Sequence, residues 1–592
     1  MKGDFSRDTF DPDKHFLRVL QQQGRVQLDS DWNEQVSILL HQLQLLARDS
    51  IGRHGTTNGG FQILDKTEAG DPLTKDFRIK PGRYYVEGML CENPSDRLLS
   101  ELPDYARPDG APASGPNYLV YLDVWERHVT YIEDDGIREK ALNGADTSSR
   151  SELVWQARLE SLNNMSAADA VENFKDGPNA YENFRKRVAR ESTGKLQADV
   201  EQNGHAHHEP CLAAPDARYR GLENQLYRVE IHRSGVANTA RWKWSRDNGS
   251  IVFPMAEPIK TDGNETTITL EHLGRDRQRG LGVNDYVEVV DDDYVRKFVS
   301  GKLLRVKELR EDQRQVILEG TPDVDVGKSL DKHPLLRRWD HGASPPLELA
   351  DDGAIPVQEN TIFELKDGIQ IQFGSQPLNG AGPNDPTWYG VGAYWLIPAR
   401  VASANIEWKS RTDNTGQTVR EWLSPKGIRH YYAPLAHINV AGTGVVAATD
   451  LRHDTSLPIE RTLSITPVLK AWNQNEHGIS ECAATSGSQI QLIPVTLPDK
   501  ARLVRLLASG RKGTSTSIKI TLKTCSVTSF DGSTVLAEID PATDLATLTE
   551  FKVSKNIVGD PVVDNTNFRY FITVSGSTGD QLWSVQVVYK PN

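Results

Sequence analysis

The sequence lacks several features that mark common protein classes. Its 592 residues include only four cysteines, at positions 91, 211, 482 and 525, which lie far apart and form no CxxC pair. We expect isolated reduced thiols, with a Cys482–Cys525 bridge as the alternative in an oxidising medium. No run of eighteen apolar residues occurs, so we expect no membrane-spanning segment. The opening Met-Lys-Gly-Asp-Phe has no apolar signal core, which predicts synthesis in the cytoplasm without a signal peptide.

Positive charge is also in short supply. The chain has 68 Lys and Arg against 81 Asp and Glu, a net charge of -13. Nucleic-acid grooves need clustered Lys and Arg, so we expect no nucleic-acid partner. The residues from Arg461 onward carry 13 basic and 11 acidic side chains, so the acidic excess lies before them.

The usual signatures of catalysis and cofactor binding are missing as well. There is no GxSxG elbow, and the glycines at 274 and 280 lack the Lys-Ser/Thr ending of a phosphate loop, so no cofactor is expected. One short loop carries four side chains that zinc favours: His205, His207, His208 and Cys211. The alternative is a solvated polar loop, because no second ligand pair is evident. The acidic run 291–293 predicts a tight turn between strands rather than a calcium loop.

The strongest local pattern is an amphipathic helix near the start. Asp29-Ser30-Asp31 offers N-cap chemistry, and Gly52 provides an end. Large apolar residues recur at three- and four-residue steps and are candidates for an assembly interface: Trp32, Val36, Leu39, Leu40, Leu43 and Leu46. Such a stripe must be covered, either by the β domains of the chain or by a second copy across a two- or three-fold axis. The sequence leaves both alternatives open.

This opening also carries a family resemblance. The runs MKGDFSR, Asp11-Pro12 and QQGRVQLDSDWNEQ (residues 22–35) resemble the start of an uncharacterised family encoded beside phage-tail-like contractile injection systems. The likeness continues through residues 81–88, 121–127, 242–250 and 394–400. It implies a β-rich appendage or body after the opening and other particle subunits as partners. It names no reaction.

The rest of the chain predicts a mainly β, multi-domain protein. Short strands with turn signals recur, interrupted by a helical insertion near 163–192, and Trp242 and Trp244 fall at period two, which favours the core. We expect the following division: 1–55 docking or oligomerisation segment, 56–265 β-rich body, 266–330 small β-barrel, 331–460 second part of the body, and 461–592 C-terminal β-sandwich.

These observations favour a non-enzymatic structural component of a contractile injection particle, baseplate-, spike- or fibre-associated. We expect a homo-oligomer, a trimer above other states, and a cell-surface glycan or receptor as a possible ligand of 461–592. The alternative is a tailspike-like appendage that binds or cleaves glycans. Glycoside hydrolysis needs two carboxylates across a sugar cleft, and Asp123 and Glu126 flank Trp125 on one predicted strand. With 81 acidic residues, the sequence selects no pair.

Overall fold

A computed structural model shows a mainly β protein made of several sheets and few helices. It describes residues 1–64, 76–102, 117–189, 191–200, 218–274, 276, 279–323, 325–340, 348–374, 386–412, 418–441, 444–454, 461–465, 482–483, 489–512, 518–527, 533–540, 550–559, 561–576 and 580–590. The metal-ligand candidates His205, His207, His208 and Cys211 lie outside these residues. The chain divides into two compact units, Met1–Asp454 (unit 1) and Thr455–Asn592 (unit 2).

Four α-helices occur in the described part of unit 1. They are α1 (Asp29–Ile51), α2 (Ala167–Val171), α3 (Ala180–Val188) and α4 (Asp292–Lys297). The predicted opening helix and the helical insertion are therefore both present. Asp291 caps α4 by accepting a hydrogen bond from the Tyr294 amide at 3.2 Å. The acidic run 291–293 thus begins a short helix, and the prediction of a tight turn is wrong because the side chain satisfies a helix amide instead.

The first part of unit 1 is built on a long antiparallel sheet. Its strands, in spatial order, are β27 (Gly444–Asp450), β26 (Tyr431–Ala441), β7 (Asn117–Val129) and β8 (Arg150–Asn163). Two small three-stranded sheets pack with it: β1 (His54–Gly55), β4 (Gly82–Val86), β5 (Met89–Asn93), and β2 (Ile63–Leu64), β3 (Arg78–Ile79), β6 (Arg97–Leu98). Because β26 pairs with β7 across more than three hundred residues, this part closes only when both ends of unit 1 are present.

A second part of unit 1 has its own aromatic core. One sheet runs β19 (Ile355–Pro356), β11 (Arg241–Ser245), β10 (Gln225–Arg233), β22 (Tyr394–Arg400), β23 (Asn405–Ile406). Its neighbours are β20 (Ile362–Glu364), β21 (Ile369–Gly374), β9 (Lys195–Val200), and the hairpin β24 (Ser410–Thr412), β25 (Thr418–Arg420). Trp242 and Trp244 of β11 are buried in this core, as their spacing predicted.

The predicted small barrel is a seven-stranded antiparallel sheet. Its order is β12 (Val252–Pro254), β18 (Leu335–Trp339), β15 (Tyr286–Val290), β16 (Leu303–Arg310), β17 (Gln315–Glu319), β14 (Glu265–Thr269), β13 (Lys260–Asp262). A bridge between Met255 and Leu270 brings the two ends of the sheet toward each other. The sheet therefore curls around an aliphatic core instead of lying flat.

Unit 2 is a β-sandwich, as predicted. One sheet is β28 (Arg461–Ile465), β36 (Gln581–Lys590), β31 (Arg502–Arg511), β34 (Glu550–Asn556), with β29 (Cys482–Ala483) also on β36. The other is β30 (Gln489–Val495), β35 (Phe568–Gly576), β32 (Lys519–Ser526), β33 (Thr534–Ile539). One apolar core lies between them. Cys525 and Cys91 are buried free thiols. Among the described residues, no helix is long and apolar enough to cross a membrane.

Candidate functional site

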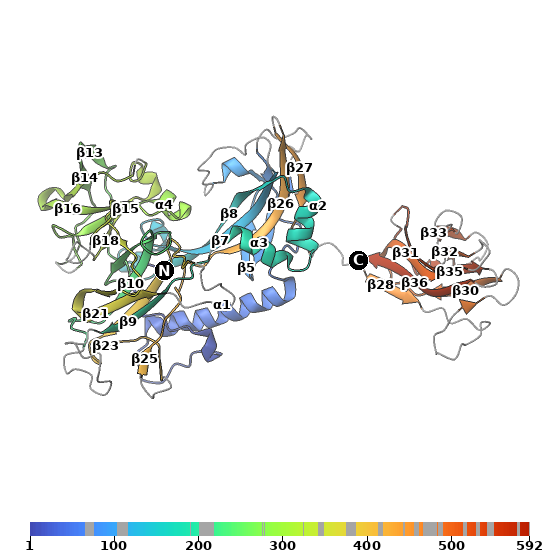
Figure 1. Cartoon of the computed structure of the whole chain (residues 1–592), viewed down its shortest axis with the longest axis horizontal. Helices are drawn as coiled ribbons and strands as arrows, with labels where there is room; N and C mark the ends of the chain where they lie inside the picture. The colour runs from blue at the N-terminus through green and yellow to red at the C-terminus, as the bar shows by residue number, and fades with distance from the viewer. Residues whose placement is uncertain are drawn as a thin grey trace. The chain divides into compact units, whose positions relative to one another are not determined.

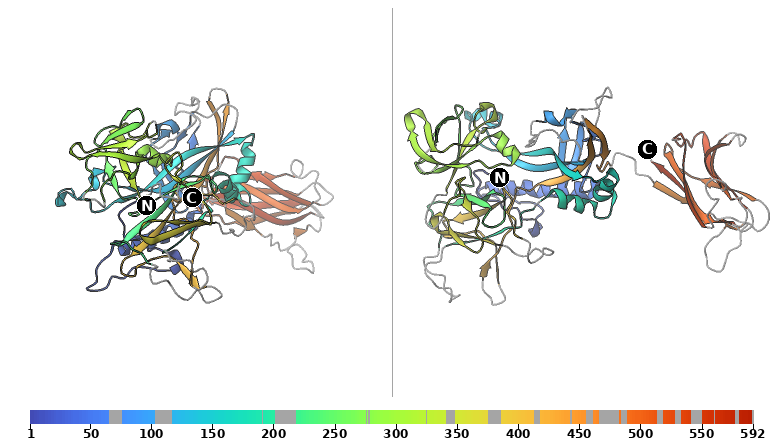
Figure 2. Two further views of the ribbon diagram at one scale, coloured as in Figure 1. Left: turned by 60° about the vertical axis from the view of Figure 1, so that its left-hand side comes forward. Right: turned by 45° about the horizontal axis from the view of Figure 1, so that its top comes forward.

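Helix α1 lies along one side of unit 1. In Figures 1 and 2 it runs from the end of the unit that carries β9 and β25 to the end that carries β5 and α3. At its C-terminal end, Arg48 and Glu87 form an ion pair of 3.7 Å, and the amide of Gly52 donates to the Arg48 carbonyl at 2.8 Å. The helix therefore ends where the sequence predicted. The predicted N-cap within Asp29–Asp31 is wrong: these residues form the first turn, the N-cap is Leu28, whose side chain has no hydrogen-bond acceptor, and Asp29 accepts from the Ser6 amide.

The apolar stripe of α1 faces away from unit 1. Its six side chains have exposed fractions between 39% and 64%: Trp32, Val36, Leu39, Leu40, Leu43 and Leu46. At 100° per residue they fall within an arc of about 120°. Ile38, on nearly the opposite side of the helix, is only 3% exposed. The sequence left two coverings of the stripe open, and one of them was the β body of unit 1. The exposed fractions show that the β body does not cover the stripe.

A second exposed apolar segment, which we name the arm, comprises residues 16–28. It is extended apart from a turn in which the Arg25 amide donates to the Gln22 carbonyl at 3.3 Å. One contact fixes it to α1: the Val19 amide donates to Gln35 Oε1 at 2.8 Å. Five of its large apolar side chains are 43% to 82% exposed: Phe16, Leu17, Leu20, Val26 and Leu28. The arm and the stripe together leave eleven large apolar side chains in solvent.

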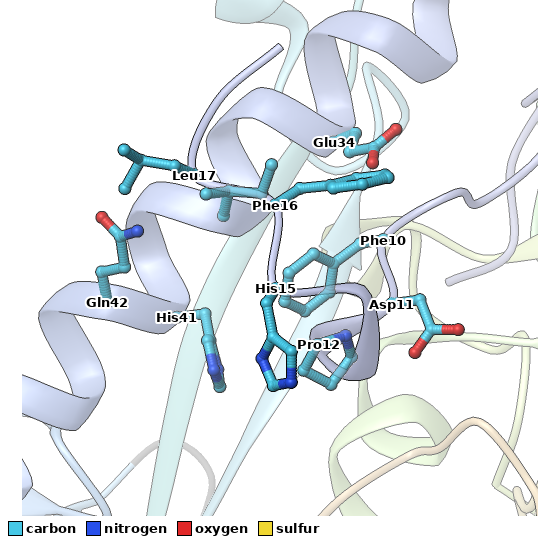
Figure 3. A pocket seen from close by; sticks show the side chains of 10 residues that line it. Phe10, Asp11, Pro12, His15, Phe16, Leu17, Glu34, His41 and Gln42 are labelled. Atoms are coloured by element: carbon cyan, nitrogen blue, oxygen red, sulfur yellow. The ribbon is translucent and has the colours of Figure 1, made fainter.

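A pocket of about 220 Å³ lies where the arm meets the helix. Figure 3 shows Phe16 and His15 on the arm side and His41 and Glu34 on α1. The Phe10 and His41 rings are 5.6 Å apart. The pocket is thus lined by aromatic and apolar side chains together with the polar groups of Asp11, Glu34 and Gln42.

Ion pairs fasten the residues before the arm to the β body. We name residues 1–11 the strap. Lys2 pairs with Glu230 at 2.8 Å, Asp8 with Lys426 at 2.8 Å and Asp11 with Lys409 at 2.8 Å. The hydrogen bond from Lys409 holds the pKa of Asp11 below its ordinary value. The strap therefore holds the start of α1 in a fixed position, so that the stripe is presented from a rigid base.

The inner end of the strap enters a buried ionic cluster. Lys243 Nζ lies 2.7 Å from Glu288 and 3.7 Å from Glu230, and its ammonium sits over the Trp339 ring at 4.4 Å. Burial alone would raise the pKa of Glu230, but the charges of Lys2, Arg228 and Lys243 bring it well below its usual range. The cluster joins β10 and β11 to β15 and β18, and so locks the curled sheet onto the aromatic core.

Of the two carboxylates considered on β7, Asp123 is engaged in ion pairs, whereas the exposed Glu126 accepts a hydrogen bond from the Ser151 hydroxyl. Asp123 is buried, and its oxygens lie 2.6 Å from His430 Nδ1 and 2.8 Å from Arg158 Nε. Burial, followed by the charge of Asp340, raises the pKa of Asp247 to about 6. Arg338 lies 3.5 Å from Asp247 and 3.8 Å from Asp340. These contacts serve packing between strands. Within the described residues, no group of three or more His, Cys, Asp or Glu side chains is arranged to hold a metal.

Sequence reasoning placed the arm inside the predicted docking or oligomerisation segment 1–55, but it named only stripe residues of α1 as interface residues. The apolar residues of the arm follow neither a helical nor a strict two-residue period, so no periodicity rule selected them. The available signal was compositional: six large apolar residues in thirteen, beside a run of glutamines, within the predicted docking or oligomerisation segment 1–55.

Comparison with known proteins bears mainly on unit 1. A search of curated proteins found no match. A family described as a family of unknown function, DUF6519, matches residues 1–199 and 179–453, which together cover nearly all of unit 1. The strap, the arm, α1 and the β body therefore all fall within a single family, and the chain belongs to DUF6519.

Proposed function

We propose that this chain is a structural component of a phage-tail-like contractile injection particle, built into it through the arm and α1. The observation that carries the proposal is the outward apolar surface of these two segments. A water-soluble monomer rarely shows a contiguous apolar patch above a few hundred Å². Eleven side chains at roughly 100 Å² each give on the order of 1,000 Å², about one side of a standard protein interface.

The composition of α1 supports a role in assembly. Residues 35–47 contain no Asp, Glu, Lys or Arg. Depletion of charge at the centre is the mark of an interface, whereas a solvent-facing helix surface is normally rich in charge. The kind of assembly rests on the resemblance of the opening residues, which is to proteins encoded beside contractile injection systems.

Co-sedimentation with the particle tests this function. Contractile particles are purified by sedimentation from cells that carry either the wild-type chain or the variant Leu39→Ser/Leu43→Ser/Leu46→Ser. We expect the wild-type chain in the particle fraction and the variant in the supernatant. The matched control is Leu142→Ser/Leu222→Ser/Leu330→Ser, which changes equally exposed leucines elsewhere on unit 1 and should sediment normally. Particles without the wild-type chain would contradict the proposal.

For unit 2 we propose recognition of a cell-surface glycan by the outer face of β36. Trp583 is 38% exposed between the buried core residues Leu582 and Val585. The hydroxyls of Ser509 and Ser584 lie next to it, 2.7 Å apart. An exposed indole can stack on the face of a sugar ring, and neighbouring serine hydroxyls can form hydrogen bonds with the sugar hydroxyls. On a glycan array, Trp583→Ala should lose binding, while Val558→Ala, another exposed apolar change in unit 2, should keep it.

A further inference from the structure

The stripe of α1 has the spacing of a coiled-coil seam. Trp32, Val36, Leu39, Leu43 and Leu46 follow one another at steps of four, three, four and three residues. This is the a/d repeat of a heptad, with Val36 and Leu43 at a and the other three at d. All five are exposed, although a/d residues exist to be covered by another helix. The spacing therefore favours another helix as the occupant of this surface.

The residues that flank this seam are compatible with a second copy of the same helix. In this register Gln35 and Gln42 occupy g, while Leu40 and Ala47 occupy e. Two copies would meet with no like charges at these positions, whereas heterotypic pairs are usually specified by opposite charges at e and g. The apolar e positions widen the seam from two to three residues per heptad, as in helices that face more than one neighbour.

The arm lies on one flank only. Val19 bonds to Gln35 at g, and Phe16 and Leu17 line the pocket with Glu34, Ile38, His41 and Gln42, so the arm lies on the side of α1 that runs from its back to the g position. Leu40 and Ala47 lie on the other flank. When parallel helices close into a ring, the g side of each meets the e side of the next. The arm of one copy thus covers Leu40 of its neighbour, and each exposed surface is used once.

We infer that three copies of this chain associate through α1 as a parallel three-helix seam, with each arm packed on the next helix. The inference rests on the proposed assembly role and names its first partner, the chain itself. Because α1 contacts the β body through Gln44 and Arg48, on the side away from the seam, the three β bodies lie outside the seam and do not obstruct it. At 1.5 Å per residue, residues 32–46 give a seam of about 22 Å.

The mass of the purified full chain is the first test. Light scattering should give three times the chain mass of 65.9 kDa, and the serine variant of Leu39, Leu43 and Leu46 should give a folded chain of single mass. The control variant of Leu142, Leu222 and Leu330 should remain a trimer. A wild-type monomer or dimer, or a serine variant that stays trimeric, would overturn the inference.

Oxidative cross-linking tests the direction of the helices. Val36→Cys and Leu46→Cys should each form disulfide-linked dimers on a non-reducing gel, because equivalent residues of parallel helices face each other. In an antiparallel pair centred on Leu39, only Leu39→Cys would cross-link. Leu142→Cys and the wild type measure the background from exposed and native thiols. Cross-linking confined to Leu39→Cys, or none above background, would contradict the parallel seam.

The two proposals fail separately. A chain that is monomeric in solution but present in purified particles would leave the particle role standing and remove the three-helix seam. A trimer that never sediments with the particle would leave the three-helix seam standing and remove the particle role.

Discussion

Glu288 shows how much a single residue contributes to the joint inside unit 1. It bonds the Lys243 ammonium and accepts a hydrogen bond from Trp339 Nε1 at 2.9 Å, and all three side chains are buried. Glu288→Ala removes the nearer anion of buried Lys243 and leaves it with Glu230 at 3.7 Å, so we expect a loss of about 3 kcal/mol in the free energy of unfolding. Urea denaturation measures it. Glu265→Ala, which removes an exposed pair with Lys307, should change the free energy of unfolding far less.

His54 should make unit 1 sensitive to acid. Burial, followed by the charge of His453, lowers the pKa of His54 to about 3, against about 6.5 in an unfolded chain. Between these two pKa values the unfolded state binds one more proton than the folded state. The free energy of unfolding is therefore highest above about pH 6.5, and it decreases by up to about 1.4 kcal/mol for each unit by which the pH is lowered. His54→Gln should flatten this slope in urea titrations from pH 4 to 6.5, whereas His272→Gln, at an exposed site, should not. Equal slopes in His54→Gln and wild type would contradict the assignment.

Individual side chains were predictable where one strand decides their environment. The period-two spacing of Trp242 and Trp244 placed both in the core. By the same rule Lys243 between them should reach solvent, yet it is 1% exposed. The curled sheet, whose Glu288 and Trp339 cover it, comes from residues dozens of positions later. No local sequence pattern predicts that a second sheet covers this side of β11.

At the scale of elements, the contact between the β4–β5 turn and α1 depends on one glycine. Gly88 has φ +84°, and a Cβ there would lie 2.1 Å from the Gln44 carbonyl oxygen. Gly88→Ala must push the helix away, and we expect a loss of about 3 kcal/mol from strain and overlap together. Gly144, with φ +77° and open space around it, isolates the strain: Gly144→Ala should cost about 1 kcal/mol. Thermal unfolding of both variants measures the difference.

The existence and end of α1 followed from the sequence, but its orientation did not. Periodicity shows that one face is apolar and says nothing about what covers it. Here Ile38 faces the pocket that Phe10 and Phe16 line, and Gln44 and Arg48 meet the β4–β5 turn, while the stripe leucines stay exposed. The orientation depends on tertiary contacts that the sequence pattern does not show, because the strap and Gly88 hold the helix at its ends and along its backbone.

At the scale of the whole molecule, the two units should unfold separately, since each has its own core. Calorimetry should show two transitions. Glu288→Ala should lower one of them, and Ile520→Ala, at a fully buried site of unit 2, should lower the other through a loss of about 2–4 kcal/mol. A single transition shifted by both variants would show that the units are coupled.

The mainly β, multi-domain architecture and the C-terminal sandwich were predictable because short strands with turn signals mark them directly. The pairing of β7 with β26 was not, since register between segments so distant leaves no local trace. The proposed zinc ligands fall outside the described residues, and the assembly role of the stripe stays a prediction.

The pairing of β7 with β26 also has a consequence for synthesis. About three hundred residues separate the two strands, and about four hundred separate the strap from its partners Lys409 and Lys426. At ~5–20 residues per second a ribosome needs ~15–60 s to cover the distance between the two strands. Throughout this interval the leucines of α1 and the apolar faces of β7 have emerged without their partners. Chaperones, or a neighbouring nascent copy, can therefore bind these apolar surfaces before β26 has been synthesised and paired with β7.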